Sequence, residues 1–580
     1  MFVVTETRPD HLTWRHWVVT LLAIAAFSII VFRLYQVQIV DHSLYLDRAL
    51  QTRHGDYKVP APRGVITDAT GYPLAASVDT WDIYIDRFLW SDINLAVPAA
   101  GELGALLNLN SEAVLTKGTS ATIGDILVKR DVNYEQGLEI RNLDLWGVRT
   151  LPSARRTYPE SNLARQVIGH VGIDGVGLWG IEADYDHLLR GQPGSYSSEL
   201  DPFGRPIAFG GNTDNRPVRG GEVQLTVDRF IQKIVEKELD RALEEFNSSS
   251  GSILVMNPRT GAILGMGSRP NADVTPNALE HQEISDLVRN RPITDLYEPG
   301  SVFKTLTAAA AIDLGRVTPE TTYFDEGVVV VNNESIYNWD FQAHGEVNVR
   351  SILQKSLNTG AVWLSEQIGT RDFYNYLAAF GIGKPTYLGL SGEATGLLRQ
   401  PSDPDWYPID LATNSYGQGL AASPLQVLTA VNVFANGGQL MRPYIVSHVI
   451  SEHDVRTFDP VLVRQVVSTD TATKISALMN DVVDGMQWHR AQVDGYAVAG
   501  KTGTTIVSTK DGYDFDTTIA SFAGFLPYEA PEISILVKID EPSGDLTLGG
   551  QVAAPVFSRV ASAIMEYLRV PPRDAMVSNP

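Results

Sequence analysis

The chain has 580 residues, a formal net charge of -22 and no cysteine. A chain of this length exceeds one compact domain, so about two or three domains are expected. The acidic balance carries no basic run that could neutralise phosphates, which excludes a nucleic-acid partner. The lack of cysteine excludes disulfides, thiolate catalysis and thiolate metal sites.

The N-terminal region contains an uncharged apolar run, residues 17–32 (WVVTLLAIAAFSIIVF), between Arg15 and Arg33. The run is slightly short for a bilayer, but Leu34 and a snorkelling Arg33 extend it. The residues that follow (RLYQVQIV) lack the small side chains of a signal-peptidase site. The sequence therefore predicts an uncleaved membrane anchor, with the large acidic remainder outside the cytoplasm.

The region after the anchor mixes helix, strand and turn signals. Residues 37–56 have the pattern of a polar helix, and a strand-rich region with turn signals follows, including residues 60–75. Residues 98–140 are predicted to form mostly short helices. Residues 155–194 are rich in Gly and Pro, as in loops, and residues 207–221 have the composition of a linker.

The pattern changes after this linker. Glu222 to Val227 alternates as a strand, and Asp228 is placed to cap an amphipathic helix that ends at about Phe246. Residues 251–257 and 261–267 are two apolar segments joined by a turn, which predicts a β-hairpin.

The rest of the chain is mainly helical until two strands near its end. Residues 351–380 and 424–436 have helical patterns, and residues 521–526 and 532–539 flank a turn with proline as antiparallel strands. Helices between an opening hairpin and closing strands predict an α+β or mixed α/β fold, with an antiparallel sheet covered by helices.

The first candidate catalytic element is Ser301, which follows a Pro-Gly turn and precedes an apolar helical run. Lys304 lies three residues on, on the same face of the predicted helix. A serine hydroxyl needs a base within hydrogen-bond reach, and lysine can serve if burial or a second cation lowers its pKa. Alone, Ser-x-x-Lys is weak evidence, since a serine cap beside a surface lysine has the same pattern.

Two further elements lie downstream. Ser356 and Asn358 form a Ser-x-Asn within a predicted helical stretch, where the hydroxyl could relay a proton and the amide could hold a substrate carbonyl. Lys501, Thr502, Gly503 and Thr504 follow an alternating segment and are predicted at a strand edge. Lys501 offers a charge for a carboxylate, the threonines offer hydroxyls, and Gly503 would let a substrate backbone approach closely.

The ordered set Ser-x-x-Lys, Ser-x-Asn, Lys-Thr-Gly is far more specific than any of its parts, and it is typical of penicillin-binding proteins and class A β-lactamases. The chain resembles a class B penicillin-binding protein along nearly all of its length. The segments that carry this resemblance in the C-terminal part are NRPITDLYEPGSVFK, NSYGQGLAASPLQ, SFAGFLP and GGQVAAPVF; those in the N-terminal part are PRGVITD, RTYP and GLWGIEADYDHLLRGQPG.

The resemblance implies a role for each motif residue. Ser301 would be the acylated nucleophile, Lys304 its general base and Ser356 the proton shuttle to the leaving amine. Asn358 would bind the substrate amide, while Lys501 would keep Lys304 deprotonated and orient Ser356. The substrate carboxylate would be received by Thr502 and Thr504 beside Gly503, and the backbone N–H groups of Ser301 and Thr504 would form the oxyanion hole.

Other matched residues are interpreted as structural: Arg63, Arg156 and Glu182 of the N-terminal part, and Glu298 beside the nucleophile. One departure from the family pattern occurs after Asp68, where the family usually continues Arg-Asn-Gly and this chain has Ala-Thr-Gly. The departure removes one expected ion pair from the N-terminal part and leaves the catalytic set intact.

The resemblance also implies a domain organisation. Residues 1–16 would be a cytoplasmic tail, 17–36 a transmembrane helix, 37–220 an elongated non-catalytic pedestal of the dimerisation type, 221–567 the transpeptidase domain and 568–580 a tail. The protein would span the cytoplasmic (inner) membrane once, with its catalytic domain outside the cytoplasm.

The implied substrates are peptidoglycan stem peptides that end in D-Ala-D-Ala, and β-lactams would be inhibitors. The implied partners are a polytopic glycosyltransferase of the shape, elongation, division and sporulation family and other division proteins. No cofactor or metal is expected, because the histidines show no ligand spacing. The compact pedestal and its GIDGVGLWGIE segment favour the septal, division-specific type over the elongation type.

Several alternatives remain at this level. A class A β-lactamase would be about half as long, and a bifunctional class A penicillin-binding protein would carry a glycosyltransferase domain where residues 40–220 resemble a pedestal. A D,D-carboxypeptidase would share the acylation and transfer the acyl group to water. A non-catalytic scaffold would be expected to lose at least one motif residue, and all are present.

Overall fold

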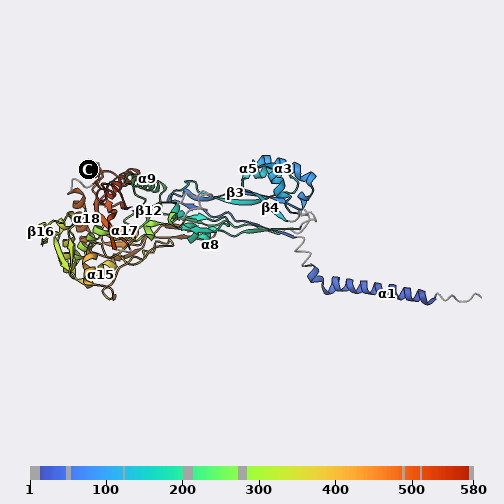
Figure 1. Cartoon of the computed structure of the whole chain (residues 1–580), viewed down its shortest axis with the longest axis horizontal. Helices are drawn as coiled ribbons and strands as arrows, with labels where there is room; N and C mark the ends of the chain where they lie inside the picture. Colours follow the sequence, from blue (N-terminus) through green and yellow to red (C-terminus); the bar gives the residue numbers. More distant parts are fainter. Residues whose placement is uncertain are drawn as a thin grey trace, which may run out of the picture. The chain divides into compact units, whose positions relative to one another are not determined.

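The computed structural model describes residues 13–46, 54–121, 124–199, 213–271, 284–485, 490–509 and 512–573. The chain divides into two compact units (Figure 1). The first unit comprises residues 1–61, 79–155 and 192–218, and the second comprises residues 62–78, 156–191 and 219–580. Two early segments of the chain thus belong to the same compact unit as its C-terminal two-thirds.

The N-terminal helix α1 (Thr13–Tyr35) continues into a π-helical turn, η1 (Gln36–Val40). Together they provide one helix, Trp14–Val40, with a mean hydropathy of 2.3, the one in the described ranges that is long and apolar enough to cross a membrane. The polar helix predicted for residues 37–56 is wrong at its C-terminal end, because strand β1 (His54–Val59) begins there.

The first unit also contains a sheet formed by β1, β8 (Gly194–Glu199) and β9 (Thr213–Asn215). Strand β9 falls in the segment predicted as a linker, so that prediction is wrong at residues 213–215. Residues 207–212 of the predicted linker lie outside the described residues.

Three helices of the first unit pack around a small core that includes Trp81 and Trp90. They are α3 (Ile93–Leu107), α4 (Ser111–Gly118) and α5 (Tyr134–Asn142). The short helices predicted for residues 98–140 are therefore present, but β4 (Asp125–Asn133), paired with the end of β3 (Pro73–Asp86), was missed. Most β4 side chains are exposed or half-buried, so the strand lacks a clear hydrophobic alternation.

The second unit is built on a five-stranded antiparallel sheet. Its strands, in spatial order, are β12 (Ile263–Arg269), β11 (Ser250–Met256), β23 (Ile533–Asp540), β22 (Gly512–Leu526) and β21 (Ala499–Thr509). The hairpin and the closing strands predicted from the sequence are confirmed, and they meet where β11 pairs with β23.

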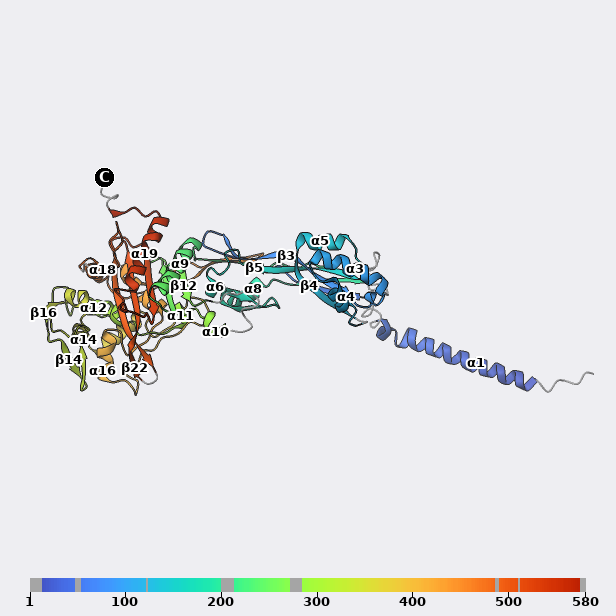
Figure 2. The ribbon, with the colours of Figure 1, turned by 45° about the horizontal axis from the view of Figure 1, so that its top comes forward.

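Helices cover both faces of this sheet, which confirms the predicted fold class. The central strand β23 is buried along its whole length. Its residues Ile535, Val537 and Ile539 join a core with α9 (Arg229–Glu245) and α19 (Ala553–Tyr567), which pack together (Figure 2). Leu536 points to the other core, with α17 (Pro424–Ala435). Because both faces of β23 are covered, its sequence is mainly apolar.

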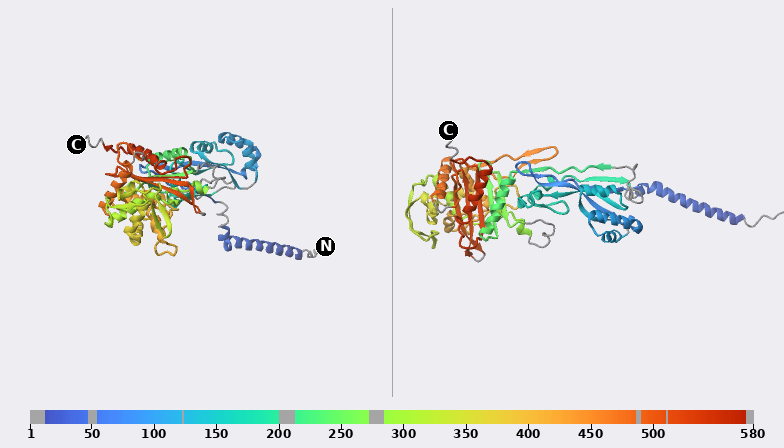
Figure 3. Two further views of the ribbon diagram at one scale, coloured as in Figure 1. Left: turned by 60° about the vertical axis from the view of Figure 1, so that its left-hand side comes forward. Right: turned by 90° about the horizontal axis from the view of Figure 1, so that it is seen from above.

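The remaining larger helices of the second unit are α12 (Lys304–Asp313), α13 (Val349–Gln354), α14 (Asn358–Ile368), α15 (Thr370–Ala379), α16 (Pro408–Ser415) and α18 (Thr469–Asp484). Helix α12 is almost entirely buried, as its alanine-rich sequence allows. Two small antiparallel pairs lie beside α14, shown in yellow-green in Figure 3. They are β13 (Thr322–Asp325) with β16 (Gly345–Asn348), and β14 (Val328–Val331) with β15 (Glu334–Tyr337).

The segments 62–78 and 156–191 are joined by a buried ion cluster. Both carboxylate oxygens of Glu182 are bound, one by Arg63 Nε at 2.6 Å and the other by Arg156 Nε at 2.7 Å. Arg63 also contacts Asp186 at 2.7 Å. Arg63, Arg156 and Glu182 thus bind one another inside the fold, as predicted for structural residues. Asp68 Oδ1 accepts hydrogen bonds from the backbone N–H groups of Thr70 and Tyr72, so the turn itself binds this oxygen in the segment where the family arginine is missing.

Replacing Glu182 by alanine is expected to lower the free energy of unfolding of the second unit by ~3–5 kcal/mol, since two buried arginines would lose their shared carboxylate. Urea unfolding of the detergent-solubilised chain measures this loss. The control is Asp470→Ala, which removes an exposed pair with Lys474 and should cost less than about 1 kcal/mol. Equal losses in the two variants would contradict the prediction.

Candidate active site

Ser301 lies in a 3₁₀ turn, η3 (Gly300–Phe303), directly before helix α12. The preceding Gly300 has a φ of 57°, a conformation that glycine adopts readily. Its N–H donates to the carbonyl of Gly417 at 3.0 Å, and a Cβ at Gly300 would come within 2.7 Å of Thr505 Oγ1. The Pro-Gly pair therefore presents Ser301 at a helix start, as the sequence predicted.

Lys304 is the first residue of α12 and its side chain is fully buried. Its Nζ lies 3.0 Å from Ser301 Oγ and 3.2 Å from Ser356 Oγ. It also donates to the carbonyl of Ser356 at 2.6 Å and to Asn358 Oδ1 at 2.7 Å. One buried amine thus contacts both serines and the asparagine that the sequence singled out.

Ser356 lies in the turn between α13 and α14, so its predicted place inside a helical stretch is wrong. Its φ is 56°, a left-handed conformation that ends the first helix and starts a new direction. Because of this turn, the carbonyl and the hydroxyl of Ser356 both reach Lys304. A continuous helix would have engaged that carbonyl in its own hydrogen bonds.

Asn358 begins α14, and its side-chain amide bonds within the protein at both ends. Oδ1 accepts from Lys304 at 2.7 Å, and Nδ2 donates to the carbonyl of Tyr337 at 2.9 Å. Asn358 therefore holds the Lys304 amine, a role that the sequence interpretation did not include.

Lys501 lies on β21, the edge strand of the five-stranded sheet, which confirms its predicted place at a strand edge. Its buried Nζ donates to Ser356 Oγ at 3.1 Å and to Thr502 Oγ1 at 3.3 Å. On the same strand, Thr504 Oγ1 accepts from the N–H of Gly549 at 2.9 Å. Ser356 Oγ consequently lies between two lysine side chains.

Packing inside the protein also requires a glycine at position 503. A Cβ there would lie 2.4 Å from Ser521 Oγ and 2.7 Å from the Pro299 carbonyl. The space that glycine leaves is therefore taken by the protein, including the loop that leads to Ser301. Its small size lets β21 pack against that loop, a structural reason that the sequence interpretation did not include.

Burial lowers the pKa of both lysines, because the charged form loses its hydration. The pKa of Lys501 falls to about 7. The pKa of Lys304 falls well below its ordinary value, since the charge of Lys501 adds to the effect of burial. Both effects favour the neutral amine of Lys304, whose lone pair would then lie beside Ser301.

The buried lysines predict a pH dependence of stability. The folded chain binds these protons less tightly than the unfolded chain, so the free energy of unfolding should rise from about pH 7 towards the ordinary lysine pKa near 10. Urea unfolding across this range should show a smaller rise for Lys501→Met. The exposed residue Lys474 gives the control, because Lys474→Met should keep the wild-type slope. Identical slopes in the wild type and in Lys501→Met would contradict the prediction.

The site is surrounded by backbone groups that belong to none of the sequence motifs. The carbonyls of Gly417 and Tyr337 and the N–H of Gly549 bind its members. Glu298 accepts from the N–H of Gly419 at 3.0 Å, and its carbonyl accepts from Thr505 Oγ1 at 2.7 Å. Glu298 thus contacts the frame, in line with its structural interpretation. Backbone groups occur in every residue type, so the sequence offered no signal for them.

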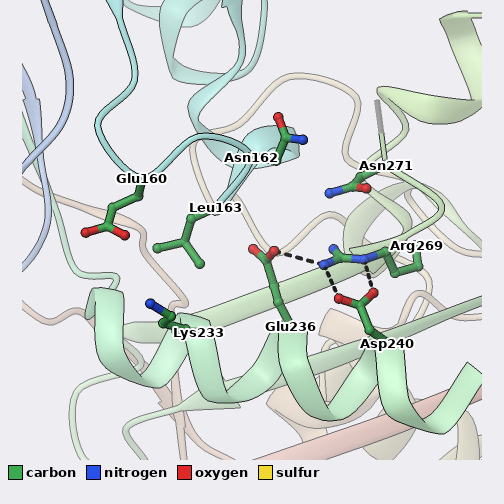
Figure 4. Close-up of a pocket in the computed structure, with 8 residues that line it drawn as sticks. All are labelled: Glu160, Asn162, Leu163, Lys233, Glu236, Asp240, Arg269 and Asn271. Carbon is green, nitrogen blue, oxygen red and sulfur yellow. Dashed lines mark hydrogen bonds and ion pairs between the residues drawn. The ribbon is translucent and has the colours of Figure 1, made fainter. Parts of the chain in front are cut away.

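A polar pocket of about 390 Å³ in the second unit is separate from these residues (Figure 4). It is lined by Glu160, Asn162, Leu163, Lys233, Glu236, Asp240, Arg269 and Asn271. Arg269 binds Glu236 at 3.0 Å and Asp240 at 2.5 Å, while Glu236 Oε1 accepts from the N–H of Ala164 at 2.7 Å. The carboxylates of α9 are thus already bound, and the pocket contains none of the motif residues.

Residues 251–562 match the penicillin binding protein transpeptidase domain, and residues 58–225 match the penicillin-binding protein dimerisation domain. All of the predicted site residues lie within the first match.

The chain is similar to known proteins over most of its length. Stage V sporulation protein D of Bacillus subtilis is 33% identical over 568 residues, which cover 97% of this chain and 87% of that protein. Peptidoglycan D,D-transpeptidase FtsI of Escherichia coli is 28% identical over 585 residues, covering 99% and 95%. The structure of penicillin binding protein 2X from Streptococcus thermophilus has a TM-score of 0.77 at 23% identity over 88% of this chain and 80% of that chain, a likeness in fold.

The transpeptidase match takes in more than half of the chain and follows a dimerisation domain. The chain therefore belongs to the class B penicillin-binding proteins.

Proposed function

We propose that the chain cross-links peptidoglycan by D,D-transpeptidation through an acyl-enzyme on Ser301. The observation that carries this proposal is the buried Lys304 amine, 3.0 Å from Ser301 Oγ and 3.2 Å from Ser356 Oγ. A neutral amine at this place can take the proton of Ser301 as the hydroxyl attacks.

In the first half-reaction, Ser301 Oγ bonds to the carbonyl carbon of the penultimate D-Ala and its proton passes to Lys304 Nζ. The peptide C–N bond then breaks, and the terminal D-Ala leaves with a proton delivered through Ser356. The N–H groups of Ser301 and Thr504 bind the oxyanion, and donors of this kind contribute ~3 kcal/mol each.

In the second half-reaction, the amine of another stem peptide attacks the ester and forms the new amide, and Ser301 regains its proton. Thr502, Thr504 and Lys501 receive the carboxylate of the D-Ala-D-Ala terminus along the edge strand β21, beside Gly503. Asn358 Nδ2 carries two hydrogens, and the one not donated to Tyr337 is available for a substrate carbonyl. A β-lactam presents the same acyl group and carboxylate and would be trapped as the ester.

Product mass tests the proposal. Purified chain is incubated with a D-Ala-D-Ala stem peptide and an acceptor amine. A product that has lost D-Ala and gained the acceptor supports transfer, and a product that has lost D-Ala and gained only water indicates a carboxypeptidase. No product together with no penicillin adduct would indicate a non-catalytic scaffold.

The septal wall is the proposed place of action, in preference to the lateral wall. The support is the full-length similarity to a protein named FtsI and to a sporulation protein. Depletion distinguishes the two roles, because filamentous cells indicate a division enzyme and rounded cells indicate an elongation enzyme.

We also propose that α1 anchors the chain once in the cytoplasmic (inner) membrane, with the catalytic unit outside the cytoplasm. An apolar helix without a following cleavage site supports this location. The proposed partners are a polytopic glycosyltransferase of the shape, elongation, division and sporulation family and other division proteins. Protease added to spheroplasts should digest the catalytic unit; its protection would contradict the orientation.

A further inference from the structure

Asp325 is a buried carboxylate at the end of β13 that belongs to no catalytic motif. It accepts five hydrogen bonds from four parts of the second unit. Oδ1 accepts from Tyr323 Oη at 3.0 Å, Gly327 N at 3.0 Å and Thr359 Oγ1 at 2.7 Å; Oδ2 accepts from Asn338 Nδ2 at 2.9 Å and His344 N at 3.0 Å.

Only a carboxylate satisfies this set of donors. Each of its two oxygens faces a backbone N–H, that of Gly327 on one side and that of His344 on the other. A backbone N–H cannot become an acceptor, so an asparagine at position 325 would direct its own N–H₂ at one of them. Burial opposes the ionisation of Asp325, but these hydrogen bonds outweigh it and lower its pKa, which keeps the group charged at neutral pH.

The partners of Asp325 lead directly to Asn358. Thr359 follows Asn358 in the chain, and Asn338 follows Tyr337, whose carbonyl accepts from Asn358 Nδ2. Thr359 and Asn338 also bond to each other, from Thr359 N to Asn338 Oδ1 at 3.3 Å. The hydrogen bond from Asn358 to Tyr337 orients the Asn358 amide. Asp325 therefore holds a neighbour of each partner, Thr359 beside the donor and Asn338 beside the acceptor.

The chain of contacts continues to the nucleophile. Asn358 Oδ1 accepts from Lys304 Nζ, and that amine lies beside Ser301 Oγ. Movement of the Asn358 amide would thus move one of the groups that orient the general base.

We infer that Asp325 is a positioning residue for the acylation step, acting through Thr359 and Asn338 on Asn358 and hence on Lys304. This inference rests on the proposed function of the same site. It differs from a purely structural role, because the carboxylate should affect the rate of the folded enzyme as well as its stability.

The test compares Asp325→Asn with Asp313→Asn. Asp313, at the far end of α12, accepts from the same kinds of donor: Tyr376 Oη at 2.7 Å, Thr471 Oγ1 at 2.9 Å and Ser468 N at 2.8 Å. Rapid mixing of the full chain with a fluorescent penicillin gives the dissociation constant and the first-order acylation rate. Asp325→Asn should slow acylation by about 10- to 100-fold, the size expected for a misplaced catalytic group, with the dissociation constant within about threefold of the wild type.

Asp313→Asn should acylate within about twofold of the wild-type rate, even where it loses comparable stability. A rate in folded Asp325→Asn equal to that of the wild type would overturn the inference. A wild type that forms no adduct would instead refute the proposed function.

A second pair of variants covers the case in which Asp325→Asn fails to fold. Thr359→Val removes the hydroxyl at nearly constant shape and should slow acylation by about tenfold. Thr359→Ser keeps the hydroxyl and should restore the rate to within about threefold of the wild type. Equal rates in these two variants would also overturn the inference.

Discussion

Replacing Ser301 by alanine is expected to abolish covalent labelling by a fluorescent penicillin and to lower cross-linking by at least about 1000-fold. Loss of the nucleophile from a residue group that acts as a unit removes nearly all of its catalysis. The side chain is partly exposed in the 3₁₀ turn η3, directly before α12, so its loss should leave the fold intact. Gel fluorescence after denaturation measures the adduct, and product mass measures the transfer.

The matched control is Ser468→Ala. Ser468 caps the start of α18, away from the motif residues, and its loss should cost stability but leave labelling unchanged. A denaturation-resistant adduct in Ser301→Ala would mean that another residue is acylated and would reject Ser301 as the nucleophile.

Replacing Lys304 by alanine is expected to slow acylation by about 100- to 10,000-fold, the range of general-base catalysis. Lys304→Arg should not restore the rate, because a guanidinium stays protonated. In the wild type, burial and the charge of Lys501 lower the pKa of Lys304 well below its ordinary value. Acylation should therefore reach its full rate at a lower pH than an ordinary lysine would allow, and the rate should fall as acid protonates the amine.

Acylation rates of the wild type measured over a series of pH values check this pH dependence. The control variant is Lys474→Ala. Lys474 is an exposed residue of α18, so this variant should follow the wild-type profile. An ordinary lysine would give a rate that rises about tenfold per pH unit up to pH 10. Such a profile in the wild type would contradict the role of Lys304 as a base with a lowered pKa.

The local elements of the second unit could be predicted well from the sequence. The cap at Asp228, the hairpin after it and the strands around Pro527 have strong periodicity or turn chemistry, and each is present. The predictions failed where this signal is weak: at β4, whose side chains are mostly exposed or half-buried, and at β9 within a Gly-rich segment.

The candidate site was predictable as a set of residue types but not as a geometry. The order of Ser301, Ser356 and Lys501 is visible in the sequence, and the structure brings their side chains around Lys304. The left-handed turn at Ser356 and the inward direction of Gly503 were missed, because both depend on how distant segments pack.

The sequence by itself determined the motif set, the placement of Ser301 at a helix start and that of Lys501 on a strand, since both placements follow from local turn chemistry and periodicity. The position of that strand at the edge of the sheet follows from pairing between distant segments. Only the tertiary structure decided that Lys304 is buried between both serines and near a second lysine, which is what lowers its pKa. Only the tertiary structure placed Asp325 behind Asn358. Burial and charge proximity arise from segments far apart in the chain, and no local pattern records them.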